Sequence, residues 1–249
     1  MKLLILVAGY AVRLQPLTLN TPKPLLPVGG KKMIDRIIDK TASIKSIDAI
    51  HVVSNHKFFQ NFVEWRSSHK DGPKILLVDD GTQTNDTRLG AIRDMELGIR
   101  KGSIEDDLLV IAGDNLFDLD LNVFLKFSKD HNDGVSVALY DVGSLEAAKK
   151  FGVVRIDDNG KVAEFEEKPQ NPKSTLISTG IYYFPKEKLA SLSKYVNSQS
   201  VKLDAPGYYI GWLSANDVVY GFPFSDKWYD IGDLQSYRKA DEEYTKKGE

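Results

Sequence analysis

Short apolar segments that alternate with amphipathic ones are the feature that most restricts how this chain can fold. Strands are expected at residues 3–8, 49–55, 74–80, 107–114 and 134–142. Between them, apolar side chains recur at helical spacing in segments 33–40, 58–62, 89–100 and 123–130. Strands that are apolar along their whole length are typical of a parallel sheet covered by helices on both faces. The pattern therefore predicts a doubly wound α/β fold.

The rhythm changes after about residue 150. Two strands are expected on either side of Asp158-Asn159-Gly160, which favours a tight hairpin turn. Further strands are expected at 176–184 and 218–222, and a last helix at 234–247. No linker rich in Gly, Pro or Ser separates the two halves. We therefore expect residues 1–249 to form a single domain with two lobes, about 1–150 and 151–249.

Composition excludes several classes of protein. The chain has 249 residues and no cysteine, which rules out disulfides, thiolate catalysis and Cys-based metal sites. The formal net charge of -2 gives no sign of a polymeric nucleic-acid partner. No apolar run reaches the roughly 18 residues of a membrane helix, and the first residues lack the cleavage site of a signal peptide. We expect a cytoplasmic protein that does not bind membranes.

Polar features follow three of the expected strands. They are the loop of residues 8–18, the sequence Asp79-Asp80-Gly81, and the sequence Gly113-Asp114-Asn115. Ligands of open α/β sheets sit at the carboxyl ends of the strands. One crevice is therefore expected to collect all three features.

The first loop has the residue types that bind phosphate. Gly9 allows a tight backbone turn whose N–H groups can face an anion. Arg13 offers a fork of donors to phosphate oxygens, and Lys23 is held between two prolines. The alternative is that both cations are surface charges on turns. No Walker pattern is present in the chain.

Asp114 is the strongest candidate for a metal ligand. It directly follows a buried strand, with Gly113 before it. Mg²⁺ usually takes one or two carboxylates and completes its octahedron with water and substrate phosphates. Asp118 and Asp120 are rival ligands farther from the strand end. The alternative is that Asp114 is a turn residue or a helix N-cap.

Five segments, in order along nearly the whole chain, resemble those of the sugar-nucleotide pyrophosphorylases, also called sugar-1-phosphate nucleotidyltransferases. They are LVAGYAVRLQPLTLNTPKPLLPVGGKKMID, LVIAGDNLF, FGVVRID with EFEEKP, STGIYYF and KWYDIGDLQSYRKA. The resemblance implies a Rossmann-like mixed sheet flanked by helices, with a smaller β-containing lobe that binds sugar. It also implies a reaction between an NTP, dTTP or UTP by family frequency, and a sugar 1-phosphate. The products would be an NDP-sugar and pyrophosphate, formed by in-line attack assisted by Mg²⁺.

The same resemblance implies roles for individual residues. Arg13 would grip the departing pyrophosphate with Lys23 beside the phosphates, and Lys168 would bind the phosphate of the sugar. Asp114 and Asp230 would hold Mg²⁺. The nucleotide would contact Leu6, Ala8, Gly9, Tyr10, Ala11, Gln83, Gly90 and Gly113. The sugar phosphate would contact Gly152, Glu167, Lys168, Thr179 and Gly180.

Some of these residues have a structural alternative. Lys168 could simply pair with Glu166 or Glu167, and Trp228 could serve packing alone. Asp230 could belong to an ordinary turn before the last helix. Self-association into a homo-oligomer is left open.

The chain departs from the family pattern in the first loop. Ala11 stands where the family has its second glycine, and Val12 stands where it has a hydroxyl residue. At a positive φ, alanine would cost roughly 1 kcal/mol, and Val12 offers phosphate no donor. The loop before Gly90 also resembles the family's base-reading loop only loosely, so the choice of base is left open. The length predicts no C-terminal β-helix domain of the kind that some members carry.

Three other functions compete with this reading. Ala11 and Val12 favour a degenerate, non-catalytic nucleotide-sugar binder or regulatory subunit. A nucleotidyltransferase of the same fold could act on another phosphate, such as phosphocholine, although FGVV and EFEEKP favour a sugar. A dinucleotide-dependent dehydrogenase is disfavoured because no GxGxxG sequence follows the first strand.

Overall fold

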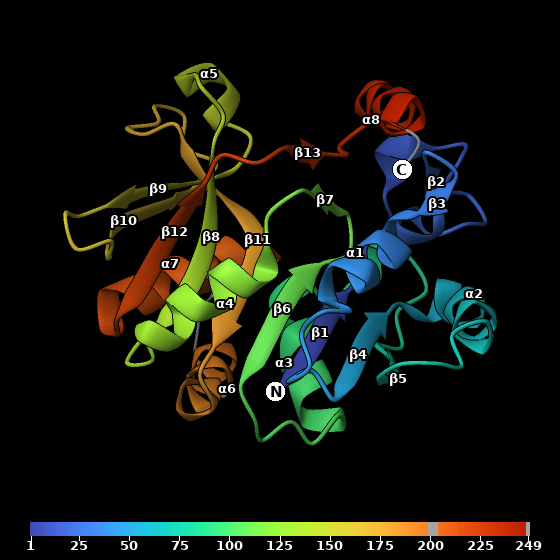
Figure 1. The fold of residues 1–249 in the computed structure, drawn as a ribbon, viewed down its shortest axis with the longest axis horizontal. Helices are drawn as coiled ribbons and strands as arrows, with labels where there is room; N and C mark the ends of the chain where they lie inside the picture. Colours follow the sequence, from blue (N-terminus) through green and yellow to red (C-terminus); the bar gives the residue numbers. More distant parts are fainter. Residues whose placement is uncertain (199–203, 248–249) are drawn as a thin grey trace.

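The computed structural model describes residues 1–198 and 204–247, and a mixed sheet runs through its centre (Figure 1). Among these residues, seven strands follow the order β10-β9-β11-β6-β1-β4-β5, and β8 and β12 join the sheet beside β11. The strands are β1 (Lys2–Leu6), β4 (Ala49–Ser54), β5 (Lys74–Asp79), β6 (Leu108–Ala112), β8 (Val135–Asp141), β9 (Gly152–Ile156), β10 (Val162–Glu167), β11 (Leu176–Phe184) and β12 (Val219–Phe224).

The sheet is parallel only in part. β1 pairs in parallel with β4 and β6, and β4 with β5, as the continuous apolar strands predict. β11 runs antiparallel to β6, β8 and β9. The hairpin expected around Asp158-Asn159-Gly160 forms between β9 and β10, and Gly160 has φ of 75°. The parallel sheet expected from the apolar strands thus forms among β1, β4, β5 and β6, and the mixed sheet implied by the family resemblance is confirmed.

Helices cover both faces of the sheet. Leu3 and Ile5 of β1 pack with α1, α2 and α4 on one face, whereas Leu4 packs with α3, α6 and α7 on the other. The apolar strands are thus buried on both sides. The helices are α1 (Met33–Thr41), α2 (His56–Ser67), α3 (Ala91–Lys101), α4 (Leu121–Asp130), α5 (Leu145–Ala148), α6 (Leu189–Asn197), α7 (Pro206–Asn216) and α8 (Leu234–Lys247).

Several short elements are not anticipated by the sequence patterns. Two small two-stranded sheets pair β2 (Pro27–Val28) with β3 (Lys31–Lys32), and β7 (Asn115–Phe117) with β13 (Trp228–Asp230). These strands are too short to show a period. Helix α7 is apolar almost all round, so it lacks the amphipathic pattern that marks a helix. In the part of the chain that is described, no helix combines the length and the apolar character needed to cross a membrane.

Candidate active site

A cleft of about 580 Å³ opens beyond the carboxyl ends of β1 and β6. That volume suits a small-molecule ligand. Its walls come from the first loop, the start of α3, the end of β10, the middle of β11, the segment 204–207 and β13. The cleft therefore collects segments from the whole length of the chain.

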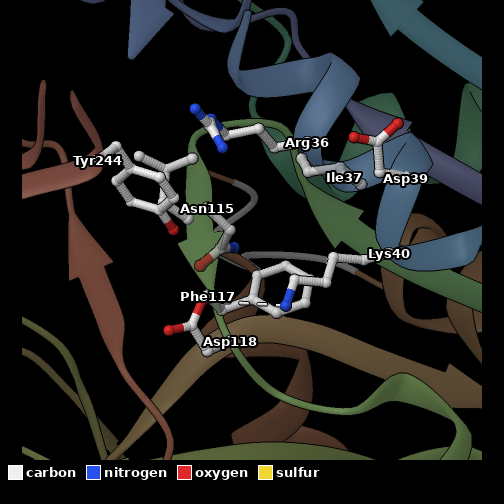
Figure 2. A pocket seen from close by; sticks show the side chains of 9 residues that line it. Arg36, Ile37, Asp39, Lys40, Asn115, Phe117, Asp118 and Tyr244 are labelled. Atoms are coloured by element: carbon white, nitrogen blue, oxygen red, sulfur yellow. Dashed lines mark ion pairs between the residues drawn. The ribbon is translucent and has the colours of Figure 1, made fainter. Parts of the chain in front are cut away.

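A second hollow lies between α1, β7 and α8 and is much smaller, at about 170 Å³ (Figure 2). Arg36 and Lys40 of α1 share it with Asp39 and Asp118, and Lys40 Nζ lies 3.9 Å from Asp118 Oδ1. Asp114 does not line it. Because this hollow is small and neither Asp114 nor Asp230 lines it, the larger cleft is the better candidate site. Asp118, a rival metal ligand by sequence, belongs to the small hollow.

The two candidate metal ligands lie side by side in the cleft. β7 directly follows Asp114, and the register of the β7–β13 pair places Asp230 opposite Asn115. A hydrogen bond from Trp228 Nε1 to Asn115 Oδ1, at 2.7 Å, holds the two strands together. Pairing of two short strands thus brings together a carboxylate from the middle of the chain and one from near its C-terminal end.

Lys23 and Arg13 set the charge around these carboxylates. Lys23 is buried, and its Nζ donates to Asp114 Oδ2 at 3.0 Å. Desolvation by the surrounding protein would raise the pKa of Asp114, but Lys23, and then Arg13, lower the pKa below its usual range. Burial, and then the charge of Asp114, raise the pKa of Asp230. Asp114 is therefore ionised, and added positive charge would relieve its repulsion with Asp230.

The donor set fits Mg²⁺ bound together with phosphate oxygens. Within residues 1–198 and 204–247, no cluster of three or more His, Asp or Glu side chains could hold a metal ion. Two adjacent carboxylates are what Mg²⁺ usually takes from a protein when a phosphate substrate supplies further oxygens. Asp114 and Asp230 provide this pair.

Ala11, not Gly9, takes the left-handed backbone turn in the first loop. Ala11 has φ of 46° and ψ of 44°, whereas Gly9 is absent from the residues with positive φ. The Ala11 carbonyl accepts hydrogen bonds from Thr18 Oγ1 at 2.8 Å and from the Leu14 N–H at 2.9 Å. A Cβ on Gly9 would meet no atom within 4 Å. The expected tight turn at Gly9 is therefore wrong, and Gly9 instead leaves open space in the cleft.

Replacing Ala11 by glycine should stabilise the protein. An L-residue in the left-handed region costs roughly 1 kcal/mol relative to glycine. We expect the Ala11→Gly variant to unfold at higher denaturant concentration, with a gain of about 1 kcal/mol in the free energy of unfolding. Ala8→Gly is the matched control, because Ala8 has no positive φ, and it should lose stability. A less stable Ala11→Gly variant would contradict the strain that we assign to this residue.

Most of the residues predicted for the site line the cleft. The structure brings together Leu6, Ala8, Gly9, Tyr10, Ala11, Arg13, Lys23, Gly90, Asp114, Gly152, Glu167, Lys168, Thr179, Gly180 and Asp230. Gln83 and Gly113 are not among the lining residues. Gln83 is exposed on the loop before α3. A Cβ on Gly113 would lie 2.4 Å from Val7 Cγ1, so Gly113 serves close packing of β6 against β1.

Glu167 occupies a narrow space at the end of the cleft formed by β9, β10 and α7. Its side chain is 9% exposed, and Lys168 Nζ lies 3.9 Å from its Oε1. Burial raises the pKa of Glu167, although the charge of Lys168 opposes the effect. A Cβ on Gly207 would lie 2.0 Å from Glu167 Oε2, and one on Gly152 would lie 3.0 Å from it. Both glycines therefore make room for this carboxylate.

An irregularity in β11 lies at the wall of the cleft. The pairing of β11 with β8 shifts register between Ser178 and Tyr182. Gly180 in this stretch has φ of 79°, and Thr179 Oγ1 donates to the Ala138 carbonyl at 2.9 Å. The Thr179 hydroxyl is thus used inside the protein, and the peptide groups next to it border the cleft.

Sequence reasoning missed residues that hold the walls in place. Asn55 is buried; its Nδ2 donates to the Ala8 carbonyl, and its Oδ1 accepts from the Phe58 N–H. The position of Asn55 between an apolar strand and a helix could have predicted this capping role. Arg88 Nε binds Asp204 Oδ1 at 3.0 Å across the cleft. No local pattern pointed to that pair, whose members are 116 residues apart.

The packing role considered for Trp228 is confirmed, and the residue also borders the cleft. It lines the cleft, and its ring packs at 5.6 Å from Tyr140 and at 5.5 Å from Phe151. Its indole also binds Asn115. Trp228 therefore joins β13 to the wall of the cleft.

Comparison with known proteins decides the family. The Nucleotidyl transferase family profile matches residues 2–247. The chain belongs to the nucleotidyl transferase family. It is 33% identical over 232 residues to the bifunctional protein GlmU of Methanocaldococcus jannaschii; the match covers 93% of this chain and 51% of that protein. This nucleotidyl transferase chain thus spans about half the length of the curated relative that it matches.

A solved structure supports the assignment. A crystal structure from Bacillus anthracis, of a protein assigned as a glucose-1-phosphate thymidylyltransferase in complex with sucrose, has a TM-score of 0.84 to this nucleotidyl transferase. The two sequences are 25% identical, and the match covers 98% of this chain and 95% of the other. The mixed α/β sheet flanked by helices is therefore the nucleotidyltransferase fold.

Proposed function

We propose that this protein transfers a nucleotidyl group from an NTP to a sugar 1-phosphate, giving an NDP-sugar and pyrophosphate. The observation that supports this most is the arrangement of Lys23, Asp114 and Asp230 around one cleft, with Arg13 beside them and Lys168 farther along. The part of the cleft built by residues 1–150 would hold the nucleotide, and the part built by residues 151–249 would hold the sugar phosphate. dTTP and UTP are the nucleotides that we propose first.

The reaction requires alignment of two anions more than it requires a base. A sugar phosphate is mostly dianionic at pH 7, because its second pKa is about 6. Its oxygen can therefore attack the α-phosphorus without first losing a proton. The obstacle is repulsion between the nucleophile and the triphosphate, which fixed positive charges reduce.

In the proposed reaction the cations of the cleft supply these positive charges. Lys168 is exposed and paired only loosely with Glu167, so it is available to the phosphate of the sugar. Arg13 would bind the β- and γ-phosphates and stabilise the charge that leaves as pyrophosphate. Asp114 and Asp230 would hold Mg²⁺, which supplies positive charge to the reacting phosphate when bound. The Glu167 carboxylate would accept hydrogen bonds from the sugar hydroxyls. The backbone near Thr179 would donate hydrogen bonds to them or accept hydrogen bonds from them.

The space at Gly207 gives a test of the sugar end of the cleft. In a Gly207→Ala variant the new methyl group would overlap the Glu167 carboxylate and press on the Phe165 ring. We expect the KM for the sugar 1-phosphate to rise about tenfold, with little change in the KM for the NTP, because loss of one hydrogen bond to the sugar costs up to about 1.4 kcal/mol, which is a factor of ten. Steady-state kinetics with each substrate varied in turn measures this split. Equal effects on both KM values would argue against Glu167 as a sugar ligand.

Pyrophosphate release tests the proposed function directly. The protein is incubated with Mg²⁺, each of five NTPs and several sugar 1-phosphates, with phosphocholine as a further acceptor. Release that requires both an NTP and a sugar 1-phosphate supports the proposal and identifies the pair. Release that occurs with an NTP and phosphocholine, but with no sugar 1-phosphate, would instead assign nucleotidyl transfer to phosphocholine. Nucleotide-sugar binding without release under any condition would support the non-catalytic binder that Ala11 and Val12 favour.

A further inference from the structure

A second pair of carboxyl groups lies in the wall of the cleft, away from the two carboxylates proposed to hold the metal. Asp94, on the first turn of α3, is 6% exposed and lines the cleft. Asp80, in the loop after β5, is close enough for a hydrogen bond between the two side chains. Asp94 Oδ1 is buried, and no donor among the described residues reaches it.

The hydrogen bonds of Asp80 determine which of the two carboxyl groups donates to the other. Asp80 Oδ1 accepts from the Thr82 N–H at 2.6 Å, and Asp80 Oδ2 accepts from Thr82 Oγ1 at 3.0 Å. The Thr82 hydroxyl is then free to accept from Tyr10 OH, which lies 3.0 Å away. Asp80 is thus an acceptor on both oxygens. Two carboxyl groups in contact need a proton between them, and Asp94 is the one placed to carry it.

The charges near Asp94 favour the protonated form. Burial, and then the charge of Asp80 and the contact with it, raise the pKa of Asp94 to about 8. Burial also raises the pKa of Asp80. The groups on neighbouring elements are Asp79, which is paired with His56 of α2; Tyr10 of the first loop; and Arg88, which is paired with Asp204. The guanidinium of Arg88 is thus already held by the Asp204 carboxylate.

The pair joins the segments that form the nucleotide end of the cleft. Tyr10 belongs to the first loop, Asp80 and Thr82 begin the loop of residues 80–90, and Asp94 lies one turn after Gly90. We infer that Asp94 is a positioning residue for the nucleotide, and that a proton shared with Asp80 keeps the loop of residues 80–90 in place against the cleft. This inference rests on the proposed function, because the ligand that it concerns is the nucleotide.

Loss of the shared proton should weaken nucleotide binding. Below pH 8 Asp94 is neutral and donates to Asp80. As the pH rises through 8, Asp94 ionises and the two carboxylates repel each other, which displaces the loop. If only the protonated form binds, about one molecule in eleven is competent at pH 9, so the Kd should be about tenfold higher than at pH 7.

Calorimetric binding of UTP and of dTTP, each with Mg²⁺, from pH 7 to pH 9 tests this inference. Asp94→Asn is the matched variant, because its amide still donates to Asp80 but cannot ionise. We expect the affinity of the wild-type protein to fall about tenfold and that of D94N to stay within twofold. Every other titrating group of the protein, and those of the nucleotide, are the same in both measurements. The difference between the wild-type protein and D94N therefore isolates the effect of Asp94. If D94N does not fold, Asp80→Asn serves instead and should give the same flat profile.

The outcomes separate this inference from the proposed function. A flat profile for the wild-type protein, or a parallel fall in D94N, would overturn the role of Asp94. A purely structural role would lower affinity or thermal stability equally at every pH and leave the slope unchanged. Binding with the expected profile but without pyrophosphate release would reject the proposed function alone. Absence of binding of both nucleotides at every pH would overturn both.

Discussion

Replacing Asp114 by asparagine should reduce pyrophosphate release about 10³-fold. The substitution removes one of the two carboxylates that we propose hold Mg²⁺, and with it much of the charge that positions the reacting phosphate. That factor corresponds to about 4 kcal/mol of transition-state stabilisation. The expected loss lies in kcat, measured as the initial rate of pyrophosphate release with both substrates saturating.

Asp118→Asn is the matched control for this prediction. Asp118 lies four residues along the same segment but lines the small hollow beside Lys40, not the cleft. We expect its activity to remain within about twofold of the wild type. In Asp114→Asn the amide oxygen still accepts from Lys23, so circular dichroism and the thermal midpoint should show a folded protein. A loss of activity in Asp118→Asn instead would assign the metal to the rival ligand.

Replacing Arg13 by alanine should lower kcat about 10²-fold or more. Arg13 lies in the 3-10 turn Val12–Leu14 at the mouth of the cleft, and its charge acts on both Asp114 and Asp230. An arginine that stabilises charge on a departing phosphate group has effects of 10³ or more in related chemistry. The effect should be larger on kcat than on the KM for the NTP, because the charge on the leaving group develops in the transition state.

Two further variants make the Arg13 result specific. Arg13→Lys retains the charge without the planar fork, so partial recovery is expected. Arg93→Ala removes an exposed arginine that does not line the cleft, and its rate should be unchanged. A normal rate in Arg13→Ala, with a normal rate in Arg93→Ala, would remove Arg13 from the mechanism.

Local sequence patterns predict much of this fold. β11 spans Leu176–Phe184 and α8 spans Leu234–Lys247, as expected from the sequence, and the other predicted elements differ from the observed ones by a few residues at their ends. A strand or helix of this kind repeats its apolar side chains with a fixed period, which neighbouring residues reveal. The strands of β7 and β13 are three residues long and show no such period.

The candidate site is predictable where one segment contributes a compact motif. The first loop, Asp114 and Lys168 follow strand ends or a family motif, and they line one cleft. Gly9 shows the limit of that reasoning, because a glycine in a loop does not by itself indicate which residue adopts the left-handed backbone conformation. The left-handed turn falls at Ala11, where Thr18 and Leu14 hold its carbonyl.

The sequence by itself determined the buried strands, most of the helices, the family and the positions of the first loop and Asp114. Only the tertiary structure decided how Asp230 comes to lie beside Asp114, that Gly207 makes room for Glu167, and that Asp94 meets Asp80. The physical reason is that each of these contacts joins residues of different strands, helices or loops, so no pattern within one element reveals it. Such contacts depend on strand register and helix packing: Trp228 and Asn115, 113 residues apart, meet because β13 pairs with β7.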